Sequence, residues 1–81
     1  MLLLIEIADS TLAYDRGIKL PLYAKYGVPE VWIVDLANNL VRFYRQPQAD
    51  TYGDITATET PGPTPIALLT GVMVDLKGVL A

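Results

Sequence analysis

LIEIADSTLAYDRGIKLPLYAKYGVPEVWIVD, residues 4–35, contains two almost continuously apolar runs with a segment of helical character between them. The first run, residues 2–8, predicts a strand, and its apolar character favours a central position covered on both faces. The second run, residues 31–35, is rich in β-branched residues and predicts another buried strand. Strand, helix and strand in this order form a βαβ unit, whose crossover is right-handed where the strands are parallel.

The segment between the two runs carries the signals of a helix. Residues 9–11, Asp-Ser-Thr, supply short side-chain oxygens of the kind that cap a first turn, and Gly27 is typical of a C-cap. We therefore expect a helix over residues 12–26. Gly17 and Pro21 disfavour an unbroken helix. We expect one helix that is kinked near Pro21, and the alternative is a first turn that leads into a second segment.

The second half of the chain predicts antiparallel strands and turns. Asn38-Asn39 indicates a turn because asparagine tolerates left-handed backbone angles. Residues 40–45 then predict a strand that returns in a hairpin and ends at Pro47. A more polar run at residues 52–58 predicts a strand at the edge of the sheet.

The last twenty residues give weaker signals. Residues 61–65, Pro-Gly-Pro-Thr-Pro, favour a rigid turn or short extended segment rather than regular structure. Residues 72–74 predict a short last strand, and residues 75–80 a terminal helical turn.

Length and composition restrict the possible functions. The 81 residues form one domain at most, and 52% hydrophobic against 19% charged residues indicate a folded chain. There is no cysteine and no histidine, which excludes disulfides, thiolate or imidazole zinc sites, and Cys or His catalysis. The net charge of -3 argues against strong nonspecific nucleic-acid binding. Without a signal peptide or a spanning segment, a soluble, cytoplasmic protein is expected.

Glu6 interrupts the first apolar strand and is the first candidate for chemistry. Because strands alternate faces, Glu6 shares one side with Leu4 and Ala8. A buried carboxylate must be paired, hydrogen-bonded or metal-bound, and the carboxyl ends of strands in open α/β sheets are where ligands bind. The alternative is a structural carboxylate that reaches solvent or a neighbouring cation, and the strand pattern leaves both open.

Lys19, on the helix that follows, is the second candidate. It pairs by spacing with Asp15, one turn earlier, and a solvated surface ion pair is the interpretation that the pattern favours. The sharper hypothesis is that the helix packs beside its own strand and that Lys19 reaches Glu6. An ammonium there could orient an attacking water and neutralise charge on a phosphoryl group.

Other polar and aromatic residues have structural interpretations. Residues 9–11 most simply cap the helix, and Asp35 ends a strand. Arg42 and Arg45 do not make a nucleic-acid groove, and no phosphate-binding glycine loop exists. A set of aromatic residues resembles base-stacking platforms, but its spacing favours helix–sheet packing: Tyr14, Tyr23, Tyr26 and Trp32.

Residues 4–35 closely resemble the core of the Uma-two family, whose members are described as putative restriction endonucleases within the PD-(D/E)XK nuclease superfamily. The resemblance continues more loosely through residues 44–47 and 71–76. It implies an α/β fold, a truncated restriction-endonuclease-like core of strand–helix–strand (residues 1–35) followed by antiparallel hairpin strands and an extension (residues 36–81). The whole chain, residues 1–81, would be a single partial domain, the carboxyl-terminal part of the family's domain.

The resemblance also implies site residues. Glu6 matches the second acidic, metal-binding position of these nucleases, and Mg²⁺ or Mn²⁺ is the implied cofactor. The usual lysine position is occupied by Ala8, and Lys19 matches the lysine that this family carries on the following helix. The first acidic residue belongs on a strand before Glu6, and the chain begins five residues before it. The expected magnesium site is therefore incomplete.

Two functions follow as expectations. The first is a prokaryotic metal-dependent endonuclease domain acting on DNA, with Glu6 and Lys19 as catalytic residues, weak or inactive alone. The alternative is a non-catalytic remnant that oligomerises or binds a partner, because an uncovered sheet edge favours self-association. A regulatory partner of a full-length relative is a third idea without positive support in the sequence. No membrane association is expected.

Overall fold

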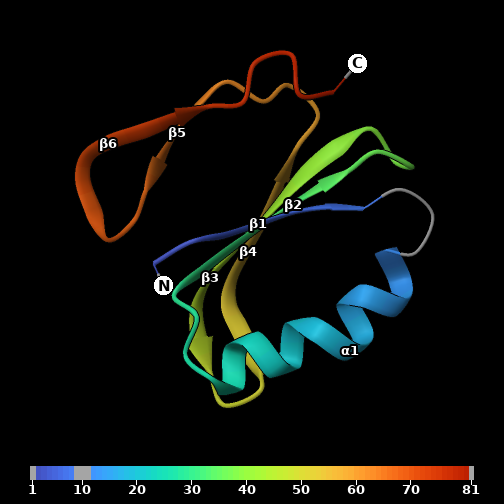
Figure 1. The fold of residues 1–81 in the computed structure, drawn as a ribbon, viewed down its shortest axis with the longest axis vertical. Helices are drawn as coiled ribbons and strands as arrows, with labels where there is room; N and C mark the ends of the chain where they lie inside the picture. Colours follow the sequence, from blue (N-terminus) through green and yellow to red (C-terminus); the bar gives the residue numbers. More distant parts are fainter. Residues whose placement is uncertain (1, 9–11, 81) are drawn as a thin grey trace.

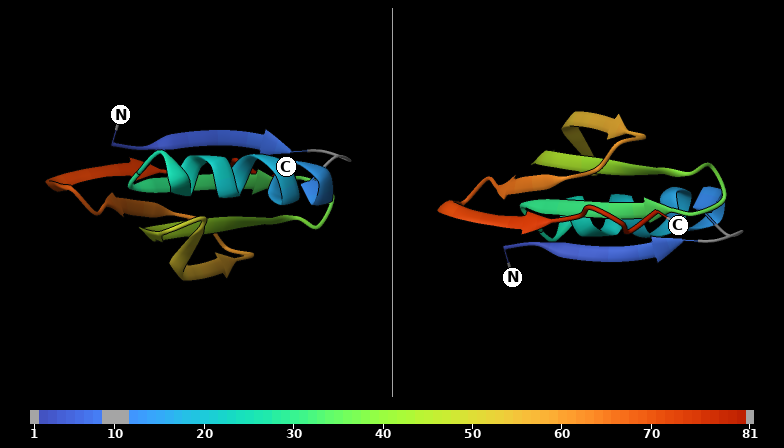
Figure 2. Two further views of the ribbon diagram at one scale, coloured as in Figure 1. Left: turned by 90° about the horizontal axis from the view of Figure 1, so that it is seen from below. Right: turned by 90° about the horizontal axis from the view of Figure 1, so that it is seen from above.

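The computed structural model describes residues 2–8 and 12–80, with the side chains of residues 12–16 and 18 left out. Three layers are stacked, with a helix on one face of a sheet and a β-hairpin on the other (Figures 1 and 2). The chain enters the sheet with β1 (Leu4–Ala8), crosses one face as α1 (Leu12–Lys25) and returns as β2 (Glu30–Asp35). The predicted strand–helix–strand unit is present, and β1 and β2 are parallel.

The four-stranded sheet has the order β1-β2-β3-β4. β3 (Leu40–Gln48) and β4 (Thr51–Thr58) follow β2 as an antiparallel meander. The hairpin on the far face consists of β5 (Pro63–Ile66) and β6 (Leu69–Asp75). The α/β class is thus confirmed in its coarse form, as a mixed, sheet-dominated fold with one helix among the described residues.

The sheet separates two hydrophobic cores because side chains alternate between its faces. Each core is built from β2 and β3 together with the layer that covers it. The helix-side core consists of Ala8, Leu20, Ala24, Val31, Ile33, Tyr44 and Tyr52. The hairpin-side core consists of Trp32, Val34, Val41, Phe43, Ile66 and Leu76.

The helix ends as its sequence predicts. Gly27 has a φ of 73°, and its N–H donates to the Ala24 carbonyl while Val28 N–H donates to the Tyr23 carbonyl. This pair of hydrogen bonds is a Schellman motif, which favours glycine at the left-handed position. A single helix runs through Pro21. The predicted N-cap at residues 9–11 lies outside the described residues.

The prediction of a central, doubly covered first strand is wrong. β1 is an edge strand of the described sheet and pairs only with β2. Its helix-side residues are covered, but on the other side Ile5 is 44% exposed and Ile7 70% exposed. An apolar run of this length indicates that the segment forms a β-strand, but it does not indicate whether other layers cover both faces of that strand.

Proline positions account for two further corrections. β3 does not end at Pro47 but continues to Gln48, with Pro47 opposite Tyr52. Pairing with β2 stops at Arg45, so beyond that point β3 has one neighbouring strand in the described sheet, and a proline is tolerated in a strand with an unpaired edge. Residues 63–66 form strand β5, because a two-stranded ribbon likewise leaves one edge of each strand without ladder bonds.

The carboxyl-terminal segment differs from its prediction as well. The last strand extends over residues 69–75, and residues 76–80 form a turn, closed by the Val79 N–H donating to the Leu76 carbonyl, in place of a helical turn. Leu76 contributes to the hairpin-side core, which holds this segment against the sheet. In the described part of the chain, no helix is long and apolar enough to cross a membrane.

Candidate functional site

Glu6 lies on the helix-covered face of β1 with a hydroxyl and an ammonium directed at one of its oxygens. The Tyr23 hydroxyl donates to Glu6 Oε1 at 2.6 Å, and Lys19 Nζ lies 3.9 Å from the same oxygen. The side chain of Glu6 is 22% exposed and that of Lys19 is 47% exposed. The carboxylate is therefore mostly covered and hydrogen-bonded, and the ammonium beside it is the more exposed of the two.

The geometry follows from the periodicities of a strand and a helix. Residues 19 and 23 are one turn apart on α1 and face the same way, while Glu6 shares its face of β1 with two buried or half-buried neighbours, Leu4 and Ala8. Packing of α1 on the sheet through Leu20 and Ala24 then brings its polar flank over Glu6.

A second polar group lies at the carboxyl end of β2. Asp35 is fully buried, and its carboxylate accepts hydrogen bonds from Asn38 N at 3.1 Å, Asn38 Nδ2 at 3.0 Å and Arg42 Nε at 3.3 Å. Burial alone raises the pKa of Asp35, but the hydrogen bonds from Asn38 and Arg42 outweigh it and hold the pKa below its ordinary value of 3.8. Asp35 therefore does more than end the strand, because it anchors both the β2–β3 turn and an arginine.

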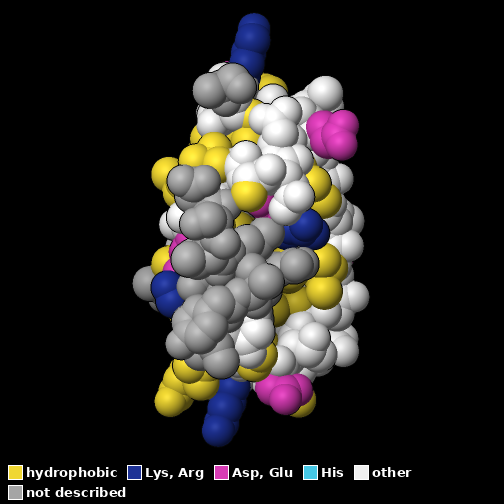
Figure 3. Space-filling view, turned by 90° about the vertical axis from the view of Figure 1, so that its right-hand side faces the viewer, with side chains coloured by type: hydrophobic (Ala, Val, Ile, Leu, Met, Phe, Trp, Pro, Cys, Tyr) yellow, Lys and Arg dark blue, Asp and Glu magenta, His cyan; other side chains and the backbone are white. Residues whose placement is uncertain are grey.

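The two groups share one face of the sheet. The register places Glu6 opposite Ile33 and Ile33 opposite Arg42, so these three side chains form one row across β1, β2 and β3. In a side view (Figure 3), the acidic and basic side chains among those described lie apart from one another, between hydrophobic and uncharged ones.

The structure brings together the two residues that the sequence singled out, Glu6 and Lys19. Their catalytic and metal-binding roles stay predictions. The alternative partner of Lys19, the Asp15 carboxylate, lies outside the described side chains. Ala8, which occupies the usual lysine position of these nucleases, is 3% exposed and packs in the helix-side core.

The predicted helix–sheet packing is confirmed for Tyr23, which packs against the helix-side core and also donates a hydrogen bond to Glu6. The same prediction is wrong for two other aromatic residues. Tyr26 is 79% exposed, and Trp32 is buried in the hairpin-side core instead of facing α1. The side chain of Tyr14 is not described. The spacing of Tyr23 from Lys19, one helical turn, is the signal that could have identified it.

Glu30 is a buried carboxylate that sequence reasoning missed. It is 1% exposed, and its Oε2 accepts from Trp32 Nε1 and Arg45 Nε, each at 2.6 Å, while its Oε1 accepts from the Ala67 N–H at 3.0 Å. The last of these bonds fastens the β5–β6 connection to the sheet. Glu30 lies on the hairpin side, across the sheet from Glu6, and its three partners indicate a structural role.

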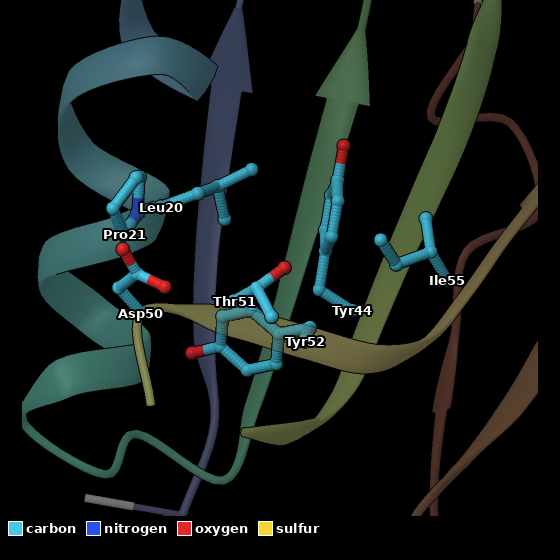
Figure 4. Close-up of a pocket in the computed structure, with 7 residues that line it drawn as sticks. All are labelled: Leu20, Pro21, Tyr44, Asp50, Thr51, Tyr52 and Ile55. Carbon is cyan, nitrogen blue, oxygen red and sulfur yellow. The ribbon is translucent and has the colours of Figure 1, made fainter. Parts of the chain in front are cut away.

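A cavity of about 150 Å³ lies between the second half of α1 and the β3–β4 hairpin (Figure 4). The Tyr44 ring lines it, and the Tyr44 hydroxyl points in the direction in which β1 and β2 end. Among the described side chains this hydroxyl is the buried polar atom without a hydrogen-bond partner. The cavity does not include Glu6 or Lys19; it is lined by Leu20, Pro21, Tyr44, Asp50, Thr51, Tyr52 and Ile55.

The donor set does not fit a complete magnesium site within residues 2–8 and 12–80. No three carboxylates of these described residues lie close enough to share a metal ion. Glu6 Oε1 already holds a hydroxyl and an ammonium, and the oxygens of Asp35 accept three hydrogen bonds. Magnesium binds six oxygens and generally takes one or two carboxylates together with water and phosphate.

The fold and this face define an α/β domain with a lysine-paired carboxylate on the helix-covered side of an edge strand. A protein-family model, Uma2, described as "Putative restriction endonuclease", matches residues 1–76. The chain belongs to the Uma2 family. No curated protein matches the chain.

Proposed function

We propose that this chain is a DNA-hydrolysing domain of the restriction-endonuclease type, with a restriction-endonuclease-like core, and that it is weak or inactive on its own. The family match supports nuclease-like chemistry. The observation that carries the proposal is the convergence of the Lys19 ammonium and the Tyr23 hydroxyl on the Glu6 carboxylate.

Each residue of this cluster has a proposed role. Glu6 is a metal ligand, and Mg²⁺ or Mn²⁺ would supply charge neutralisation at a phosphodiester when bound. Lys19 orients water and stabilises charge that develops on the phosphoryl oxygens. The Tyr23 hydroxyl holds Glu6 Oε1 and thereby orients the whole carboxylate, including Oε2. Weak activity follows because the described residues supply one carboxylate of the several oxygens that a metal requires.

A nicking assay on supercoiled DNA with Mg²⁺ or Mn²⁺ tests the proposal. We expect slow, metal-dependent nicking that Glu6→Gln and Lys19→Met abolish and that Tyr23→Phe reduces. Glu59→Gln, at an exposed position directly after β4, is the matched acidic control. Nicking that persists in Glu6→Gln would contradict the assignment, and so would a wild-type protein that neither nicks nor binds DNA.

A second function, self-association without catalysis, has its own observation. Strand β1 has one described neighbour, and Ile7 on it is 70% exposed, with Ile5 beside it. An edge strand with exposed apolar side chains is a template for pairing with another chain. In sedimentation, we expect a dimer that Ile7→Lys converts to a monomer; a monomeric wild-type protein at high concentration would exclude this function.

A further inference from the structure

Arg42 lies in the same cross-sheet row as Glu6 and is held by a buried carboxylate. We propose that Arg42 binds a DNA phosphate a few nucleotides from the one that Glu6 and Lys19 act on, and that Asp35 is its positioning residue. This inference rests on the proposed function and adds to it a contact that sets the track of the DNA backbone.

The row sets the spacing between the two points of contact. Glu6 and Arg42 are separated by Ile33 alone, which makes two inter-strand steps of about 4.8 Å each, or roughly 10 Å between backbones. A nucleotide adds about 3.4 Å of axis rise per strand of DNA. This backbone separation therefore suits two phosphates a few nucleotides apart on one DNA strand.

The surroundings of Arg42 orient its guanidinium. Asp35 Oδ2 accepts from Arg42 Nε at 3.3 Å, and the Arg42 side chain is 22% exposed while that of Asp35 is fully buried. Asp35 is itself fixed by two hydrogen bonds from Asn38. A guanidinium carries five N–H donors in a rigid fork that matches phosphate geometry, so fixing it through Nε orients the fork in advance.

Arg45 provides a matched control on the same strand. Like Arg42, the Arg45 side chain is 22% exposed and donates through Nε to a buried carboxylate, which here belongs to Glu30. It differs in its face, because it lies on the hairpin side of β3 and its guanidinium is over the Phe43 ring, 5.2 Å from the centroid. Any loss of DNA binding that follows from a weakened fold should be as large at Arg45 as at Arg42.

The test measures binding of a fluorescein-labelled DNA duplex by anisotropy, with Mg²⁺ present, at several salt concentrations. We expect Arg42→Gln to weaken binding roughly tenfold and to lower the slope of log affinity against log salt by about 0.9, the value for one phosphate contact. Arg42→Lys should restore the slope but not the full affinity, because a lysine keeps the charge and loses the fork. Arg45→Gln should leave the slope unchanged.

The outcomes separate this inference from the proposed function. A wild-type protein that binds and nicks DNA, with Arg42→Gln unchanged in slope, overturns the inference and leaves the proposed function intact. Loss of slope in both Arg42→Gln and Arg45→Gln also overturns it. Slope loss confined to Arg42→Gln, without nicking by the wild type, supports the phosphate contact in a chain that binds DNA but is inactive on its own. A wild-type protein without DNA affinity overturns both. Circular dichroism establishes that each variant is folded. If Arg42→Gln does not fold, the affinity of Arg42→Lys decides: a reduced affinity supports the inference, and an affinity equal to that of the wild type overturns it.

Discussion

Replacing Glu30 tests how the hairpin layer is held to the sheet. This carboxylate is almost completely buried and accepts three hydrogen bonds, two of them on one oxygen from Trp32 and Arg45. Glu30→Ala removes the charge that balances the Arg45 guanidinium and the acceptor for the Ala67 N–H. Three donors, on β2, on β3 and in the β5–β6 connection, lose their partner in one substitution.

The expected loss of stability is large for a chain of this size. Removing one partner of a buried ion pair costs about 3–5 kcal/mol, because the other charge is left uncompensated. A domain of 81 residues is stable by roughly 4–12 kcal/mol. Glu30→Ala is therefore expected to remove a quarter or more of the free energy of unfolding. Glu30→Gln keeps the shape and one acceptor, and should cost about 2 kcal/mol.

Urea unfolding followed by tryptophan fluorescence measures this loss, since Trp32 reports directly on the site. Amide hydrogen exchange adds a local readout: the Ala67 N–H should lose protection in both variants. Glu59→Ala is the control, because Glu59 is exposed. A Glu30→Ala protein within about 1 kcal/mol of the wild type would refute the reasoning, as would unchanged protection of Ala67.

Two further predictions concern the helix-covered face. Tyr44→Phe should raise the free energy of unfolding by about 1 kcal/mol, because it removes a buried hydroxyl without a partner. Tyr52→Phe should lower the free energy of unfolding by about 1 kcal/mol, because it loses the 2.8 Å hydrogen bond to the Val28 carbonyl. Thermal unfolding that ranks the two variants the other way contradicts this prediction. The pKa of Asp35 is depressed below 3.8, so the Asp35 contacts stabilise the fold above about pH 4 and lose that effect as the pH falls through the lower, folded-state pKa. The stability difference between wild type and Asp35→Asn should therefore shrink on acidification, and a difference that is constant from pH 7 to pH 2 would show that Asp35 does not contribute in this way.

Part of the candidate site was accessible from sequence because it depends on short-range order. Glu6 was conspicuous as a charge in an apolar strand. The pattern around Lys19 favoured a surface pair with Asp15, and its pairing with Glu6 was a hypothesis that the family resemblance supported. The partnership of Arg42 with Asp35 was not accessible. It depends on which strand pairs with which and in what register, and a shift of one residue would have placed Arg42 on the opposite face.

The same division applies to the fold. Local chemistry along the chain was sufficient for the order of strand, helix and strand, the glycine end of the helix and the turn at Asn39, where φ is 56°. It was not sufficient for the edge position of β1, the passage of β3 through Pro47, or the strand at residues 63–66. These depend on neighbours far apart in the chain, because a strand becomes central or peripheral, and a proline is tolerated or excluded, only through the strands that pair beside it.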